Sequence, residues 1–274
     1  MLLSRFWRRD LRMVRRVRKQ GRESFLVGTA HFSPYSFRRH LTGLIEQSDF
    51  ALFEGPLDPP GMERVVAAGM EGRNAGGLLD ELDEKTLKTI ARILDLAVPE
   101  RSSLINPYMP EPSAKNLLDQ TISTMKPWMA FFGIYTAYLK KKGWRHSVDM
   151  EAYEIARELG KTTVFMETIE EQIEVLETLS CEQMADFLKR IDSWSTYTRY
   201  FMRWYLNGDL TQIARNPYNF PTRNPWVIDR RDAIFCERMG PYLERGRAAV
   251  FGGVPHMTGV SRILIEEGYE IVHA

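Results

Sequence analysis

Four short apolar runs, each followed at once by sequence of helical character, constrain the fold of this chain more than any other feature. The runs cover residues 24–27, 49–53, 162–166 and 248–251. A fifth run at 269–272 follows a predicted helix at 260–267, which Gly268 ends. Strands that alternate with helices are typical of α/β proteins with a parallel sheet. We therefore expect an α/β fold with a central mixed, mostly parallel sheet flanked by helices.

Local signals predict several boundaries. A β-hairpin is predicted around Gln20-Gly21, with its second arm entering the core. Ser33-Pro34 predicts the start of a helix, because serine is a good N-cap and proline suits the first helical position. Thr168 and Glu171 form a capping box that predicts the start of another helix.

The sequence between residues 60 and 145 differs from the two ends of the chain. It contains helical spacings such as Leu87, Ile90 and Leu94, separated by loops rich in proline and glycine. We interpret this block as a helical cap inserted into the α/β fold. The predicted organisation is a basic segment at 1–22, which includes the first hairpin arm, and one α/β domain at 23–274 with a helical insertion at about 60–145.

The charge of the chain is nearly balanced except at its start. Lys and Arg number 37 and Asp and Glu number 36, but residues 1–22 hold nine basic side chains and one acidic one. A balanced molecule has no overall field that favours nucleic acid, so no specific nucleic-acid partner is expected. We interpret the basic start as a solvated hairpin edge that its charges protect from aggregation. Contact of residues 1–19 with acidic lipid or RNA is the alternative.

Targeting signals are not evident in the sequence. Basic residues interrupt every apolar run near the start, so the apolar core of a secretory signal is missing. The longest apolar stretch, 127–139, is shorter than the ~20 residues of a transmembrane helix. Cys181 and Cys236 are expected to be reduced and buried. We expect a cytoplasmic protein, with peripheral membrane attachment as the alternative.

A residue that can bind a metal or transfer a proton follows each of the four predicted parallel strands. These residues are His31, Glu54, Glu167 and His256. The carboxyl ends of parallel strands form one edge of a sheet, and ligands bind there in open α/β folds. Two imidazoles and two carboxylates suit Mn²⁺, Co²⁺, Zn²⁺ or Fe²⁺. Such an ion activates a bound water and a glutamate can accept its proton, so the pattern predicts a hydrolase.

Each histidine of this set stands three residues after a glycine, Gly28 or Gly253. Glycine there permits a positive φ or a close backbone approach that directs the imidazole over the strand end. The structural alternative is that each histidine is a satisfied core group and each glutamate caps a helix. Signatures of zincins, serine hydrolases and P-loop proteins are absent from the sequence.

The stretches 26–31 and 251–256 together resemble the two Gly-x-x-His elements of the TraB/GumN family, to which the Tiki-type metalloproteases are related. The resemblance extends over most of the chain. It includes Lys126-Pro127-Trp128, Val148-Asp149, the run from Met166 to Gln172, Trp204 with Gly208-Asp209, and Arg231-Asp232.

The resemblance implies a fold similar to the erythromycin-esterase and ChaN-like group, and a metal-dependent peptidase activity. The metal, expected to be Mn²⁺, Co²⁺ or Zn²⁺, would be bound by His31, Glu54 and His256. Glu167 and Arg231 would line the pocket. The catalytic candidates carried by the matched motifs are Glu167, Arg231, Asp232 and Asp149.

Two hypotheses of different classes follow. The first is a metal-dependent hydrolase, most readily a peptidase, in which Glu167 transfers a proton and Arg231 binds a carboxylate or stabilises an oxyanion. The alternative is a non-catalytic binding protein that uses the same crevice for a peptide, a small signal or haem. The expected partner is in both cases a peptide or small-molecule ligand.

Overall fold

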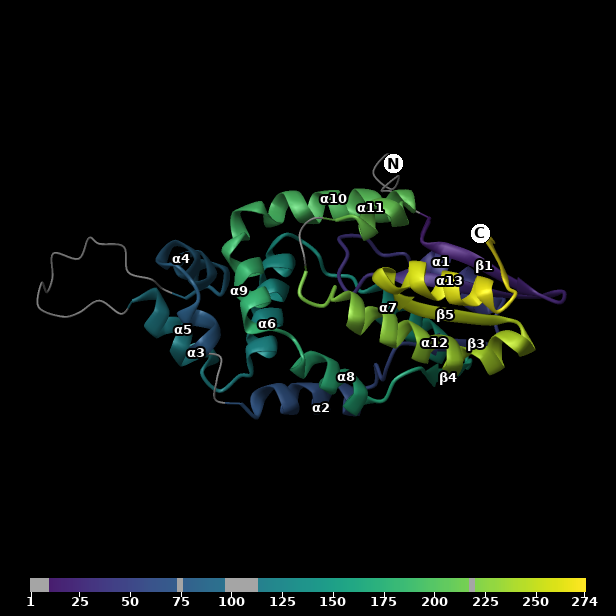
Figure 1. Ribbon diagram of the computed structural model, residues 1–274, viewed down its shortest axis with the longest axis horizontal. Helices are drawn as coiled ribbons and strands as arrows, with labels where there is room; N and C mark the ends of the chain where they lie inside the picture. The colour runs from purple at the N-terminus through teal and green to yellow at the C-terminus, as the bar shows by residue number, and fades with distance from the viewer. Residues whose placement is uncertain (1–9, 73–75, 97–112, 217–219) are drawn as a thin grey trace, which may run out of the picture.

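The computed structural model describes residues 10–72, 76–96, 113–216 and 220–274, in which six strands form one sheet (Figure 1). The strand order is β4 (Thr162–Phe165), β3 (Phe50–Phe53), β5 (Ala248–Gly253), β2 (Arg22–Thr29), β1 (Val14–Lys19) and β6 (Glu270–His273). The first four strands run parallel, and β1 is antiparallel to both of its neighbours. The predicted mixed, mostly parallel sheet is confirmed.

Burial explains why the central strands form where they do. All six residues of β5 are buried, as are the last six of β2. Strands covered on both faces read as continuous apolar runs, which is the pattern that the sequence has here. The strands at the two edges, β4 and β6, hold no fully buried residue.

Helices cover both faces of the sheet. On one face α1 (Arg38–Glu46) packs against α7 (Val148–Glu158), and on the other α12 (Pro225–Arg245) packs against α13 (Met257–Glu266) (Figure 1). The α7 helix contacts β3 and β4, whereas α12 contacts β2 and β5. The result is a three-layer α/β/α arrangement whose core lies on the two faces of the central strands.

A second, helical part lies beyond one end of the sheet (Figure 1). Its helices are α2 (Pro59–Met70), α3 (Gly76–Asp80), α4 (Glu84–Ile93), α5 (Ala114–Ile122), α6 (Pro127–Lys141), α8 (Ile169–Glu177), α9 (Cys181–Lys189) and α10 (Trp194–Asn207). The short α11 (Leu210–Ala214) leads back towards the sheet. Phe131, Phe187 and Trp194 are buried at the centre of this part, in aromatic contact through Phe187. The helical part therefore uses chain from both before and after β4.

Three local expectations are wrong. The first helix begins at Arg38 rather than after Ser33, because Ser33 is buried and exchanges backbone hydrogen bonds with His146. The segment Val14–Lys19 is not an edge, because β6 pairs with its far side. Cys181 is exposed, although Cys236 is buried and both are free thiols.

The first nine residues lie outside the described residues, and with them three of the nine basic side chains of the start, Arg5, Arg8 and Arg9. The described helices include none that is both long enough and apolar enough to cross a bilayer.

Candidate functional site

Strand register brings the predicted site residues to one edge of the sheet. Phe53 is paired with Phe165 on one side and with Phe251 on the other, and Phe251 is paired with Val27. All four parallel strands therefore reach their carboxyl ends at nearly the same level. The residues that follow these ends converge there, as the sequence predicts.

The guanidinium of Arg231, which α12 carries, lies at the centre of this convergence. Its Nε and Nη2 donate to the two oxygens of Glu167 at 2.7 and 2.8 Å. Nη2 also donates to Oε2 of Glu54 at 3.2 Å, and Nη1 lies 3.2 Å from Nε2 of His256. Glu167 and His256 are buried, and the Arg231 side chain is 16% exposed. Arg231 therefore acts as a buried cation shared by two carboxylates and an imidazole.

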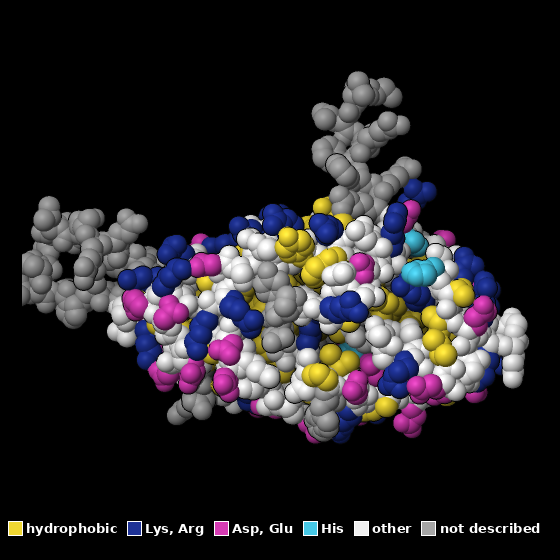
Figure 2. Space-filling model, turned by 45° about the horizontal axis from the view of Figure 1, so that its top comes forward, with side chains coloured by type: hydrophobic (Ala, Val, Ile, Leu, Met, Phe, Trp, Pro, Cys, Tyr) yellow, Lys and Arg dark blue, Asp and Glu magenta, His cyan; other side chains and the backbone are white. Residues whose placement is uncertain are grey.

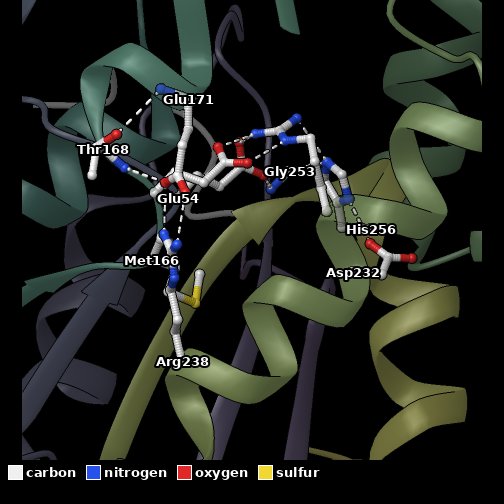
Figure 3. Close-up of polar contacts among 10 residues, drawn as sticks. Glu54, Met166, Thr168, Glu171, Asp232, Arg238, Gly253 and His256 are labelled. Carbon is white, nitrogen blue, oxygen red and sulfur yellow. Dashed lines mark hydrogen bonds and ion pairs between the residues drawn. The ribbon is translucent and has the colours of Figure 1, made fainter. Parts of the chain in front are cut away.

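The hydrogen bonds fix the tautomer of His256. A guanidinium can only donate, so Nε2 of His256 must accept from Arg231. Nδ1 then carries the proton and donates to Oδ1 of Asp232 at 2.6 Å (Figure 3). Asp232 is almost fully buried, and burial raises the pKa of its carboxyl group. A Cβ on Gly259 would stand 1.8 Å from Oδ2 of Asp232, so only glycine allows this approach.

Glu54 is an ionised buried carboxylate. Burial alone would raise its pKa, but the charge of Arg231 and a hydrogen bond from the backbone N–H of Gly253 lower it to about 2. The Gly253 nitrogen lies 2.5 Å from Oε1 of Glu54 (Figure 3). For Arg231 the directions are reversed: burial lowers its pKa, but the negative charges of Glu54 and Glu167 have the larger effect and raise that pKa above its ordinary value.

The two glycines serve close packing, not a left-handed backbone. Gly253 has a φ of −52°, and neither it nor Gly28 is among the described glycines with positive φ. A Cβ on Gly28 would lie 2.9 Å from the side chain of Met257, and one on Gly253 would lie 3.0 Å from Glu54. Of the two roles expected for these glycines, close approach is the one found.

His31 is paired with Asp149, and no hydrogen bond of the described residues joins it to the Arg231 cluster. Its Nδ1 is 2.9 Å from Oδ2 of Asp149, which stands in the first turn of α7. The Asp149 side chain is 7% exposed, whereas that of His31 is 70% exposed. The charge of Asp149 raises the pKa of His31 to about 9. His31 still acts on the cluster through its charge, because it helps to lower the pKa of Glu54.

The arrangement does not fit the expected metal ion as the side chains stand. Glu54 and His256 are neighbours, with Oε1 and Nε2 3.7 Å apart, but the guanidinium of Arg231 lies against both. Among the described residues no three His, Cys, Asp or Glu side chains converge as metal ligands. A metal ion and a guanidinium at one point would repel each other. Ligation of a metal ion by His31, Glu54 and His256 therefore stays a prediction.

Sequence reasoning missed a clamp behind the site. Nη1 of Arg238 donates to the carbonyl of Met166 at 2.7 Å, and its two terminal nitrogens bind the carboxylate of Glu171 at 2.6 and 2.7 Å (Figure 3). Glu171 closes the capping box with Thr168, which confirms that prediction. The clamp holds the turn that carries Glu167. Arg238 follows Arg231 by seven residues, or about two helical turns. This spacing places both arginines on one face of a helix, and it is the sequence pattern that could have predicted the clamp.

Replacing Arg238 by methionine is expected to lower the free energy of unfolding by about 1 kcal/mol, because a bidentate but half-exposed pair is lost. Glu171→Gln should lower the free energy of unfolding by a similar amount. The double variant should lower it by less than the sum of the two single effects. Arg238 lowers the pKa of Glu171 to about 2, so the coupling should vanish as pH falls from about 4.5 towards 2. Urea unfolding of the four proteins measures this; strictly additive effects would show that the clamp contributes nothing.

Comparison of the sequence with family models gives a match to the model described as the TraB/PrgY/gumN family, over residues 13–273. This range contains every residue of the site. No curated protein and no solved structure matches the chain. The match confirms the resemblance that the two Gly-x-x-His elements indicate.

Proposed function

The chain belongs to the TraB/PrgY/gumN family, and from that membership and its site we propose that it is a hydrolase that cleaves peptide bonds. The observation that carries the proposal is the pairing of exposed His31 with buried Asp149, at the sheet edge where Arg231 supplies a fixed positive charge. Related Tiki-type proteases support a peptide rather than another acyl compound as substrate.

His31 is the group that transfers the proton. Asp149 holds Nδ1, which leaves Nε2 on an exposed ring free to meet water and substrate. Neutral Nε2 takes a proton from water while the water oxygen attacks the carbonyl carbon. The tetrahedral intermediate then collapses, the C–N bond breaks, and the proton on Nε2 passes to the leaving nitrogen. The imidazole returns to its neutral form, so the chemistry balances without another reactant.

Arg231 supplies the positive charge that stabilises the oxyanion. A guanidinium has five N–H groups, and the contacts with Glu167, Glu54 and His256 use four of them. The fifth is on Nη1 and can donate to the substrate carbonyl oxygen. Because the two glutamates fix the guanidinium in place, little reorganisation is needed in the transition state. Glu167 thus acts by holding Arg231 rather than by transferring a proton, a different role from the one expected.

A mixture of synthetic peptides, read by mass spectrometry, tests the activity. His31→Gln is expected to reduce cleavage at least about 100-fold, the effect of losing a general base. His146→Gln is the matched control, because the half-exposed side chain of His146 also has a carboxylate, that of Glu151, 3.1 Å from its Nδ1. It should cleave as the wild type does. Equal cleavage by His31→Gln and wild type would contradict the proposal.

The same assay decides the metal question. The mechanism above uses the chain's own residues, so cleavage is expected to persist in EDTA. Loss of cleavage in EDTA, restored by Mn²⁺, Co²⁺ or Zn²⁺, would reinstate the metal-dependent peptidase. Absence of cleavage under every condition, together with a Soret band on adding haem, would favour the binding protein instead.

A further inference from the structure

A second cavity lies away from the residues of the Arg231 cluster. It has a volume of about 810 Å³ and lies between α11, α13 and the strands β1 and β6. Four basic side chains line it: Arg15, Arg215, Arg262 and His273. Each comes from a different element or loop, so no single surface helix accounts for the cluster.

Arg15 is the unusual member of this set. It is 8% exposed, and the hydrogen bond described for it goes to the carbonyl of the adjacent Val14 at 3.0 Å. Within the described part of the chain no carboxylate lies in ion-pairing distance of it. Burial lowers the pKa of its guanidinium, which shows that the protein environment disfavours this charge. A buried arginine without an anionic partner is costly, so a ligand that supplies one would be stabilised here.

His273 reinforces the preference for an anion. In the antiparallel pair of β1 and β6 it is directly opposite Arg15, so the two side chains share one face of the sheet at about 5 Å between Cβ atoms. Arg262 faces the same cavity from α13, where Glu266 is 3.0 Å from it. Asp209 also lines the cavity, but it accepts from the backbone N–H of Gln212. The acids present are thus engaged, whereas Arg15 and His273 face each other.

Besides the hydroxyl side chains of Thr211, Thr258 and Ser261, the wall has an apolar part. Leu210 and Ala214 of α11, Ile265 of α13 and Ile271 of β6 line the cavity, and Ile265 is 55% exposed. Figure 2 shows hydrophobic side chains exposed between basic ones on the face that carries α10 and α11. An inorganic ion would satisfy the arginine but leave this apolar surface in water. A ligand with an aliphatic part would cover it.

We propose that this cavity binds a small organic anion in which a carboxylate or phosphate group is joined to an aliphatic body. The anionic group lies between Arg15 and His273, and the aliphatic part lies along Ile265, Ile271 and Leu210. Neither the proposed hydrolase activity nor its residues enter into this inference.

Calorimetric titration with decanoate and with decyl phosphate, below their micelle concentrations, tests the proposal. Wild-type protein is expected to bind one equivalent of at least one of them, and inorganic phosphate and decanol should bind at least tenfold more weakly. Preference for decanoate or for decyl phosphate identifies the anionic group. If only inorganic phosphate binds tightly, the proposal that the ligand has an aliphatic body is wrong. If neither decanoate nor decyl phosphate binds, the proposed binding site is wrong.

The matched variants are Arg15→Met and Arg18→Met. Both remove one arginine from β1, but Arg18 is on the opposite face of the strand and is paired with Glu23 at 2.7 Å. Arg15→Met is expected to weaken binding by tenfold to about a hundredfold, the effect of one hydrogen bond to a charged group. Arg18→Met should bind as the wild type does. If both variants weaken binding equally, the effect comes from the loss of one positive charge anywhere on the strand, which would contradict the proposal.

Thermal melting separates a ligand-binding Arg15 from a structural one. Without ligand, Arg15→Met is expected to melt at the wild-type temperature or above it, because the variant removes an unpaired buried charge. A lower melting temperature would show that Arg15 stabilises the fold and would contradict this role. If the variant does not fold, His273→Gln, at an exposed position of β6, serves instead and should weaken binding at least threefold.

Discussion

Arg231→Met is expected to lower the free energy of unfolding by about 3–5 kcal/mol at pH 7, the largest effect of any substitution considered. The variant leaves Glu54 and Glu167 buried within the same site without the cation that both contact. Removing one partner of a buried ion pair costs more than the pair contributes, because the remaining charge stays desolvated. Urea unfolding measures the loss, with Arg64→Met as control, because Arg64 forms an exposed pair with Glu170.

The sign of the pH dependence distinguishes this explanation from simple loss of packing. In the wild type the pKa of Glu54 is about 2, so its contribution to stability is present above about 4.5 and is lost as pH falls towards 2. Without Arg231, burial dominates and raises that pKa above its ordinary value. The variant should therefore gain more stability than the wild type as pH falls from 7 to 5. A loss below about 1 kcal/mol that does not vary with pH would contradict the role given to Arg231.

The same variant tests whether Arg231 prevents metal binding. Removing the guanidinium leaves the two carboxylates and the imidazole of His256 without the cation that all three contact. Addition of Mn²⁺, Co²⁺ or Zn²⁺ should then raise the melting temperature of Arg231→Met more than that of the wild type. An equal rise in both proteins would show that the guanidinium and the metal do not compete.

Asp149→Asn is expected to lower the pKa of His31 from about 9 to near its ordinary 6.5. The cause is loss of the negative charge 2.9 Å from Nδ1. Histidine-selective NMR titration measures it directly and needs no substrate. Glu151→Gln is the control, since it removes the carboxylate beside His146 and should leave the titration of His31 unchanged. A His31 titration midpoint unchanged in Asp149→Asn would contradict the pairing.

The pKa of His31 should give activity and stability opposite pH dependences: as pH rises towards 9, the cleavage rate should rise and the free energy of unfolding should fall. Because His31 must be neutral to accept a proton, cleavage by the wild type should rise about tenfold per pH unit up to about pH 9. In Asp149→Asn the midpoint should move down by more than two units, with a lower maximal rate because the ring is no longer oriented. The raised pKa contributes stability below about 6.5 that is lost as pH rises through about 9, and the variant should lack this loss.

The sequence predicts the sheet well because the signals are local. Buried runs such as 248–251 have to be strands in an α/β chain of this kind, and β5 covers Ala248–Gly253. The gathering of Glu54, Glu167 and His256 at one edge follows from parallel strands alone. The predicted helix after Ser33 fails for the opposite reason. Its N-cap signal is local, but a backbone bridge to His146, more than a hundred residues away, determines the structure.

Pairing among the site residues could not be predicted in the same way. Residue type and strand position do not reveal that His31 meets Asp149 and not Glu54, because that choice depends on how α7 packs on the sheet. Nor does the sequence reveal that the guanidinium of Arg231 donates to the carboxylates of both Glu54 and Glu167. Two turns of α12 separate Arg231 from Arg238, and both arginines point to the same strand ends. Such contacts depend on tertiary packing, which local patterns do not specify.

The position of β5 in the sheet has a consequence for biosynthesis. This strand lies between β3 and β2, yet it is made some two hundred residues after them. Until it leaves the ribosome, both neighbours expose unpaired backbone edges and apolar side chains, which favours aggregation or chaperone binding. His256 arrives with the same segment. The nascent polypeptide therefore cannot complete its buried charge cluster before this segment has been made.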